Sequence, residues 1–331
     1  LLIRCLETIE SHGVDDPTIH VHVCENASGD GSADRIRCEI DARGWSGWVS
    51  LVALDHNRGF TGGNNVLLRS LLDSPTPPAS ILLLNPDTEV ESAAIKRLFE
   101  RLMQRPEWGA AGPAIVGADG SRQTSCFNDP TPFSEFLRAA CTGPLDRTFS
   151  RRRASKNPPH DEGPHDWTSF AAAMLRPDAL NASGIFDEGY FAYFDDPDLC
   201  WRIRRAGWLV GHCAEATIMH LEGASTGIRD IRQARRRSPP YQLRGRARYF
   251  AKRHGIAGLW LANLCWHAGR LISWSRELIE RRPSHLPRSQ WRDIWTNAFR
   301  PWHAPHLPHP PLAEETANPP ESETALEGIQ R

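Results

Sequence analysis

Three short apolar runs, each followed by a polar segment, restrict the folds open to this chain of 331 residues. The runs have the alternating or fully apolar pattern of β-strands, and segments with helical spacing of apolar residues separate them. The runs are 19–24, 49–54 and 81–84, the polar segments are 25–32, 57–65 and 85–88, and the helical segments are 1–12, 66–73 and 91–104. Strands alternating with helices predict an α/β doubly wound domain with a mostly parallel sheet flanked by helices. Ligands bind such sheets at the carboxyl ends of the strands, so the polar segments are candidate binding loops.

The rest of the chain divides into parts of different character. Residues 117–165 are irregular in pattern, and we expect them to form a mobile insertion. We predict an α/β domain over 1–228 and a basic, amphipathic helical extension over 229–282. From 283 to 331 the chain is rich in Pro and His and then acidic, which predicts a disordered tail.

Composition excludes several classes of protein. Apolar residues make up 40% of the chain, enough to fill a core, so a wholly disordered chain is excluded. The 39 Lys and Arg balance 40 Asp and Glu, so no global charge draws the chain to nucleic acid. The 8 cysteines include no CxxC pair, which argues against a zinc knuckle and is typical of free thiols in a reducing, cytoplasmic compartment.

The most apolar stretch, residues 255–275, is interrupted by Asn263, His267 and Arg270. We therefore expect a packed or interfacial helix and not a membrane span. Residues 229–253 before it are rich in Lys and Arg. Two interpretations are open: a peripheral contact with an anionic membrane at its inner face, or a basic helix that packs back onto the α/β domain.

Asp87 is a candidate metal ligand, because it follows the apolar run 81–84 and Pro86 stiffens the turn. A carboxylate in such a position suits Mg²⁺ or Mn²⁺, although strand ends also carry Asp as an ordinary turn residue. His220 follows a strand-like run and can ligate a metal as a neutral imidazole. With 14 histidines in the chain, a structural or exposed His220 is the commoner case.

Three carboxylates follow an aromatic run near the start of a predicted helix; they are Asp195, Asp196 and Asp198. Adjacent like charges resist simultaneous ionisation, so one of the first two is a candidate general base with a raised pKa. Alternatively, acidic residues at a helix N-terminus stabilise only the helix dipole, and Asp198 fits that role.

The segment Asn57–Asn65, NRGFTGGNN, is similar to a nucleotide-binding loop. Its glycines allow the backbone to approach a ligand, and the helix that follows offers free N–H groups. It has neither the GK[ST] ending of a P-loop nor a GxGxxG pattern. Kinase, ATPase and dehydrogenase functions therefore lose their main support.

Five segments, in order along residues 1–228, resemble the signature blocks of glycosyltransferase family 2, and most closely its rhamnosyltransferase-like branch. They are ENASGDGS, NRGFTGGNN, LLLNPDT, FDEGYFAYFDDPDLCWRIRRAGW and MHLEGAS. The family implies a GT-A fold, in which one half of an α/β sheet binds the nucleotide and the other half the acceptor. It also implies inverting transfer of a sugar from a nucleotide-sugar, usually with Mg²⁺ or Mn²⁺.

The resemblance implies a role for each matching residue. Asp87 matches the metal-binding carboxylate of a DXD-type motif, and His220 matches a histidine that reaches the metal or the diphosphate. Asp196 matches the catalytic base of the family's Glu-Asp pair, with Asp195 in place of the Glu. The residues implied to line the nucleoside pocket or to hold the nucleotide and donor sugar are Glu25, Asn26, Asp30, Asn57, Gly59, Phe60, Gly63, Asn64 and Asn85.

The resemblance also implies the partners. The donor is expected to be a nucleotide-sugar such as a deoxythymidine diphosphate rhamnose, and the acceptor a cell-surface glycan or its lipid-linked precursor. The chain departs from the family in lacking its first strand before Leu1, in Glu25 where Asp is usual, and in Phe170 where glycine is common. Two alternatives stay open: a non-catalytic nucleotide-sugar- or glycan-binding protein inactivated by loss of that strand, and a nucleotidyltransferase on a similar sheet.

Overall fold

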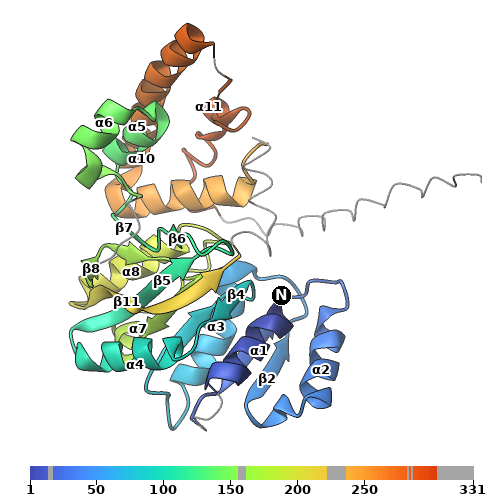
Figure 1. Cartoon of the computed structure of the whole chain (residues 1–331). Helices are drawn as coiled ribbons and strands as arrows, with labels where there is room; N and C mark the ends of the chain where they lie inside the picture. Colours follow the sequence, from blue (N-terminus) through green and yellow to red (C-terminus); the bar gives the residue numbers. More distant parts are fainter. Residues whose placement is uncertain (14–17, 156–161, 222–235, 282, 285, 304–331) are drawn as a thin grey trace, which may run out of the picture.

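A computed structural model of the chain describes residues 1–13, 18–155, 162–221, 236–281, 283–284 and 286–303. Its larger part is an α/β domain with helices on both faces of a central sheet, and a helical unit stands beside this domain (Figure 1). The α/β class expected from the alternation of strands and helices is therefore confirmed.

The main sheet has the strand order β3-β10-β5-β11-β4, and the short strands β6 and β8 pair with β5 and β11. The strands are β3 (Ile81–Leu84), β4 (Thr88–Val90), β5 (Trp108–Val116), β6 (Arg122–Gln123), β8 (Gly163–His165), β10 (Ala172–Leu175) and β11 (Leu209–His220). Strands β5 and β11 are parallel, whereas β10 and β4 run antiparallel to their neighbours. The sheet is thus mixed where the sequence predicts a mostly parallel one. Strand β10 lies between β3 and β5 and runs opposite to both, and its partners are far from it in the sequence, so local pattern does not reveal its direction.

A second, two-stranded sheet lies beside the main one. In it, β1 (Val21–Glu25) pairs in parallel with β2 (Val49–Ala53). Successive residues of both β1 and β3 line a cavity of about 2150 Å³. Successive residues of a strand point to opposite faces of the sheet, so a cavity that contacts all of them lies along the unpaired edge of each strand. No strand within the described ranges fills this space, so sheet pairing is interrupted between β1 and β3.

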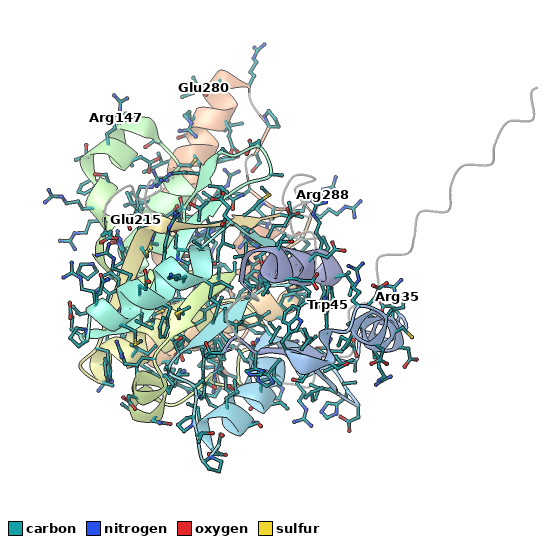
Figure 2. All side chains as sticks on the ribbon, turned by 60° about the horizontal axis from the view of Figure 1, so that its bottom comes forward. Arg35, Trp45, Arg147, Glu215, Glu280 and Arg288 are labelled. Carbon is teal, nitrogen blue, oxygen red and sulfur yellow. The ribbon has the colours of Figure 1, made fainter. Side chains whose placement is uncertain are left out.

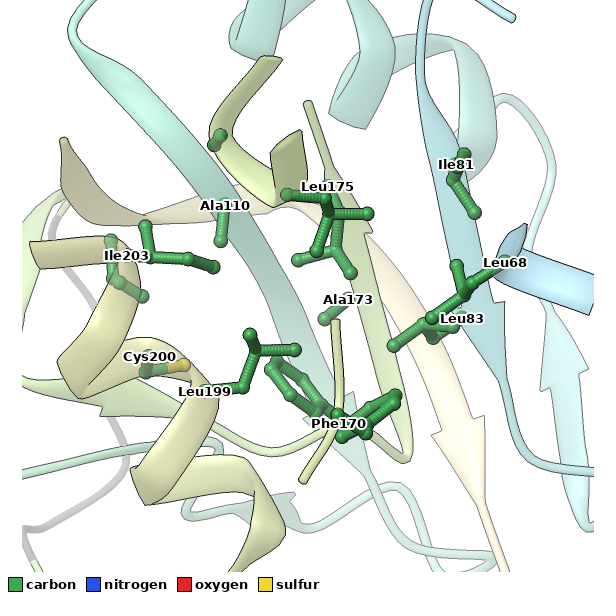
Figure 3. Packing of buried hydrophobic residues seen from close by; sticks show 14 residues of the cluster. Leu68, Ile81, Leu83, Ala110, Phe170, Ala173, Leu175, Leu199, Cys200 and Ile203 are labelled. Carbon is green, nitrogen blue, oxygen red and sulfur yellow. The ribbon is translucent and has the colours of Figure 1, made fainter. Parts of the chain in front are cut away.

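Helices cover both faces of the main sheet because its strands are apolar on both sides. The helices of the α/β domain are α1 (Leu2–Gly13), α2 (Ser32–Ala42), α3 (Gly59–Leu72), α4 (Ala94–Gln104), α7 (Pro177–Ser183) and α8 (Asp195–Arg205). Ala173 of β10 belongs to the same cluster as Leu68 of α3 and Leu199 of α8 (Figure 3). The next residue, Met174, packs with Leu98 of α4 on the opposite face. Side chains along β10 alternate between the two faces of the sheet. One face packs against the layer of α3, α7 and α8, and the other against the layer of α1 and α4.

Segment 117–165 is folded over its described length, contrary to the expectation of a mobile insertion. It contains β7 (Cys126–Phe127), α5 (Pro132–Ala140), α6 (Gly143–Thr148) and the short 3-10 helix η2 (Ser150–Arg152), and β7 pairs with β9 (Trp167–Thr168). Glu135 of α5 is buried and accepts a hydrogen bond of 3.0 Å from Arg246. Burial alone would raise the pKa of Glu135, but Arg138 and Arg246 hold it at about 2. This ion pair fixes α5 through a residue more than a hundred positions away, which local sequence pattern does not reveal.

The predicted helical extension corresponds to α10 (Pro240–Glu280), whose helical geometry is broken at Gly255 (φ 73°, ψ 172°). Residues 240–254 lie over the α/β domain, and residues 256–280 extend away from it beside α5 (Figure 1). The start of the extension, 229–235, lies outside the described residues.

Part of the expected tail 283–331 is folded against α10. It forms α11 (Gln290–Asp293), and Ile294 after it is buried in a cluster with Trp266 of α10. Aromatic contacts with α10 explain why this Pro-rich stretch is folded. Residues 304–331 lie outside the described residues.

Candidate active site

The glycine-rich segment forms the first turns of α3, which begins at Gly59 and not after Asn65 as expected. Gly59 has φ +70°, and a Cβ atom there would lie 2.4 Å from the carbonyl oxygen of Phe191. The amide of Phe60 donates to that same oxygen over 2.7 Å, and the Thr61 hydroxyl donates to the Tyr190 carbonyl. Glycine is therefore required at position 59 because the helix start touches the backbone of residues 190–191.

Two asparagines hold the start of α3 in place. Asn26, directly after β1, donates through Nδ2 to the Gly59 carbonyl (2.8 Å) and accepts from the Arg58 amide (2.9 Å). Asn57 accepts from the Gly59 amide over 2.8 Å. These side chains thus join the ends of β1 and β2 and shape the backbone there, at a helix N-terminus suited to an anionic ligand.

Glu25 and Asp30 stabilise the loop between β1 and α2. Glu25 accepts from the Ser28 amide (2.7 Å) and the Ser32 hydroxyl (3.2 Å), while Asp30 accepts from the Ser32 amide (2.9 Å). Burial alone would raise the pKa of Glu25, but these hydrogen bonds lower it. The bonds to Ser32 likewise lower the pKa of Asp30. Both carboxylates are therefore ionised at neutral pH.

The cavity between β1 and β3 brings together most residues that the sequence assigns to nucleotide-sugar binding. Those on its wall are Glu25, Asn26, Asp30, Gly59, Phe60, Gly63, Asn64 and Asn85. Asn57 is not on the wall and acts on the backbone of Gly59 instead. The carboxylates and histidine expected to carry out chemistry lie outside this wall.

Asp87 and His220 meet where β3 ends and β11 ends. Asp87 is buried, and its Oδ1 lies 3.4 Å from Nε2 of half-buried His220. The two chain ends are also joined by a 2.9 Å hydrogen bond from the Leu221 amide to the Asp87 carbonyl. Residues separated by more than a hundred positions are thus adjacent, as the metal-site prediction requires. Residues 222–225 of the MHLEGAS segment lie outside the described residues.

A divalent metal fits the chemistry of this pair, since carboxylate oxygens suit Mg²⁺ and Mn²⁺ and a neutral imidazole is a common metal ligand. Within the described residues, no group of three or more His, Cys, Asp or Glu could hold a metal without other ligands. Mg²⁺ is commonly held by one or two carboxylates together with substrate phosphates. A metal shared between Asp87, His220 and a bound diphosphate would match this limited donor set.

Asp195 and Asp196 begin α8 after two consecutive non-glycine residues in the left-handed region, Tyr193 (φ 69°) and Phe194 (φ 66°). Such conformations are strained and persist where the surroundings enforce them, often at functional sites. Asp195 is buried, whereas Asp196 is half-buried. Burial raises the pKa of Asp195 to about 6, and burial together with the Asp195 charge raises the pKa of Asp196 well above its ordinary value.

One backbone segment connects this carboxylate pair to the end of β3. The amide of Phe170 donates to the Asp196 carboxylate, and the carbonyl of Ala171 accepts from the Asn85 amide over 2.9 Å. The Phe170 ring packs in the core against Phe186, with ring centroids 5.6 Å apart. The departure from glycine at position 170 is therefore accommodated by the core, as Figure 3 shows.

Sequence reasoning missed Asn65 and assigned Asp198 only a helix-end role. Asn65 is fully buried, donating to the Phe186 carbonyl (2.9 Å) and accepting from the Phe186 amide (3.1 Å). Asp198 accepts from Tyr190 and from Lys252 of α10, so it joins α8 to the helical unit. A polar residue among the apolar positions of a helix is a signal that could have indicated the buried role of Asn65. Sequence pattern does not reveal the distant partners, which are Phe186 for Asn65 and Lys252 for Asp198.

No family model matches the chain. Among curated proteins, an N-acetylglucosaminyl-diphospho-decaprenol L-rhamnosyltransferase of Mycobacterium tuberculosis is 30% identical over 222 residues, which are 65% of this chain and 67% of the relative. The low-salt glycan biosynthesis hexosyltransferase Agl10 of Haloferax volcanii is 27% identical over 164 residues, 50% of this chain and 49% of that protein.

Two solved structures are similar in part. GalNAc-T7 with UDP, GalNAc and Mn²⁺ has a TM-score of 0.49 at 11% identity, and the match covers 85% of this chain and about half (55%) of that one. The mannosyltransferase PcManGT from Pyrobaculum calidifontis with GDP-Man and Mn²⁺ has a TM-score of 0.47 at 15% identity, with 91% and 80% covered. The assignment rests instead on the mycobacterial relative and on the five segments found in order: the chain belongs to glycosyltransferase family 2.

Proposed function

We propose that the protein is an inverting, metal-dependent glycosyltransferase that moves rhamnose from a nucleotide-sugar to a hydroxyl of a lipid-linked glycan precursor. The name of the mycobacterial relative supports this donor sugar and an acceptor of the N-acetylglucosaminyl diphosphate polyprenol class. Such an acceptor resides in a membrane, so we further propose that the protein acts at its cytoplasmic face. No helix within the described residues is long and apolar enough to cross a bilayer.

The Asp195–Asp196 pair is the observation that carries the proposal. A general base works best with a pKa near the operating pH, and the pKa values of both carboxyl groups are raised in that direction. Asp196 retains access to solvent, so it takes the role of base, while buried Asp195 keeps the pKa of Asp196 high. The start of α3 and the loop of Glu25 take the role of the nucleotide site.

In the proposed reaction, the acceptor oxygen forms a bond to the anomeric carbon while Asp196 accepts the hydroxyl proton. The bond from that carbon to the diphosphate oxygen breaks, and its electron pair leaves with the nucleoside diphosphate. Attack opposite the leaving group inverts the anomeric centre in one step, without a covalent enzyme intermediate. Asp87 and His220 would hold the divalent ion, which neutralises charge on the departing diphosphate.

The test is incubation of the full chain with deoxythymidine diphosphate rhamnose, Mn²⁺ and an N-acetylglucosaminyl diphosphate polyprenol. We expect a rhamnosylated lipid whose anomeric configuration, read by NMR, is opposite to that of the donor. In a parallel incubation with added pyrophosphate, its consumption with formation of deoxythymidine triphosphate and rhamnose 1-phosphate, without sugar transfer to the lipid, would favour the nucleotidyltransferase alternative. Donor binding without consumption, in the presence of metal and acceptor, would favour the non-catalytic binding protein.

A further inference from the structure

Four basic residues in the first segment of α10, namely Arg246, Arg248, Lys252 and Arg253, are paired with acidic groups of the protein itself. Arg248 donates to Asp187 over 2.8 Å, and Lys252 donates to Asp198 over 3.0 Å. Arg246 is buried against Glu135. In the described part of 229–253, these charges therefore attach α10 to the protein, which was the second of the two interpretations open at the sequence level.

The second segment of α10 has a different surface. Its inner side, including Leu259, Trp266 and Ser273, is buried, and Gly269 closely approaches the backbone of α5. Its outer side is apolar and exposed: Leu261, Leu264, Leu271, Trp274, Leu278 and Ile279 have exposed fractions of 52%, 59%, 63%, 51%, 60% and 83%. Between residues 256 and 275 the one charged side chain is Arg270, which is paired with Glu277. This outer side is an uncharged apolar face.

Exposed aromatic residues in α11 and after it add to this apolar surface. Trp260 of α10 donates to the Ala298 carbonyl over 2.9 Å and packs against Phe299, which holds the two segments side by side. Trp291, Phe299 and Trp302 are 64%, 74% and 53% exposed. Tryptophan suits the boundary of a bilayer, because it has an apolar ring and one polar N–H group. We name the outer side of 256–280 together with these aromatic residues the apolar face.

The charges around the apolar face distinguish its possible occupants. The helical unit that carries this face also carries exposed arginines, among them Arg147, Arg151, Arg281, Arg288, Arg292 and Arg300. Among the described residues of 132–155 and 236–303, Glu280 is the exposed acid. Figure 2 shows Glu280 and Arg147 at the same end of the molecule. A second copy would bring like charges together across the contact, whereas an anionic lipid surface complements them.

We propose that the apolar face docks onto an anionic phospholipid bilayer, with α10 lying in the interface. The opposite side of the helix is buried against α5 and α11, so only one side is available to the lipid. This inference rests on the proposed function, because it supplies the means by which the enzyme reaches a lipid-linked acceptor. It locates the contact on 256–302 and not on the basic segment before it.

The test is co-sedimentation of the full chain with vesicles of phosphatidylcholine alone or of equal parts phosphatidylcholine and phosphatidylglycerol. We expect binding to the anionic vesicles at low salt, with partial release at high salt. The double variant Leu264→Glu, Leu271→Glu should weaken this binding about tenfold or more, since affinity follows the buried apolar area. The matched control is Leu209→Glu, which alters an exposed leucine (39%) at the start of β11 and should bind as the parent does.

Two results would overturn the docking proposal: equal binding by the parent and the double variant, or a parent that ignores anionic vesicles. A concentration-dependent dimer in light scattering that ignores vesicles would assign the face to a second copy instead. Mn²⁺-dependent nucleotide-sugar binding, measured in the absence of vesicles, should be the same in the parent and both variants. If the parent does not dock onto vesicles but binds the nucleotide-sugar, only the docking proposal fails and the proposed transfer reaction stands. If the parent does not bind the nucleotide-sugar, the proposed transferase function itself is contradicted.

Discussion

Asp196→Asn is expected to lower turnover about a hundredfold or more while leaving nucleotide-sugar binding in place. The amide keeps the shape of the carboxylate but cannot accept the acceptor's proton. The measurement is steady-state transfer together with calorimetric titration of the donor. Asp178→Asn is the matched control, because Asp178 is an exposed acid in the first turn of α7 and should be silent. If Asp195→Asn abolishes turnover and Asp196→Asn is nearly silent, Asp195 is the base.

The pH dependence of turnover provides a further check on the same pair. A carboxyl group with a raised pKa retains its proton to higher pH, and a protonated group cannot act as a base. The two groups titrate as a pair, so turnover should rise with pH as the pair loses its second proton, the one on Asp196, above the value of about 6 at which the pKa of Asp195 lies. In Asp195→Asn the neighbouring charge is lost, so the pKa of Asp196 falls and any residual activity should rise at lower pH.

The free energy of unfolding should depend on pH with the opposite sign: the contribution of Asp195 falls as pH increases, whereas turnover rises. Because the pKa of Asp195 is raised in the folded state, the native protein holds this proton more tightly than the unfolded chain does. Its stabilising contribution is complete below the unfolded pKa of about 4 and is lost as pH rises through the folded value. Urea unfolding across this pH range, compared with Asp195→Asn, isolates the contribution.

Asp87→Ala is expected to remove the metal-dependent component of nucleotide-sugar binding. Loss of even an outer partner of a metal ligand costs about 10–100-fold in affinity, so loss of a proposed ligand should cost at least as much. The fold should persist, because the main chain of Asp87 still accepts from Leu221. Unchanged Mn²⁺-dependent affinity in a calorimetric titration would remove Asp87 from the metal site. Glu89→Gln is the control, since Glu89 is a nearby acid that pairs with Arg4.

Sequence predicts the elements whose structure depends on local pattern. The run 81–84 is a strand because it is apolar throughout, and Asp195 begins a helix because acidic residues favour its N-terminus. The order of polar segments also places the candidate nucleotide residues on one cavity. These features require only neighbouring residues or the general rule that ligands bind at strand ends.

Features that depend on distant partners were not predictable in this way. The glycine-rich segment is helical from Gly59 because residues 190–191 receive its first N–H and hydroxyl groups. Helix α5 is held by Glu135 through Arg246, and the end of α11 by contacts with α10. The residues alone made Asp87 and His220 separate candidates for metal ligation, and the family resemblance implied that both act at the metal or diphosphate. The 3.4 Å approach of their side chains gives them a common location.

The interruption between β1 and β3 also affects which parts of the molecule open first. A two-stranded sheet is marginal by itself, and the buried cluster over β1 and β2 is small; it includes Ile36 of α2 and Trp45. This unit should open as a cooperative subglobal event, exchanging its amide hydrogens for deuterium before those of β5 and β11. Glu25 and Asn26 lie in the same unit, so a bound nucleotide would slow that exchange. Nucleotide affinity and the stability of this unit would then both depend on the equilibrium between its closed and open states.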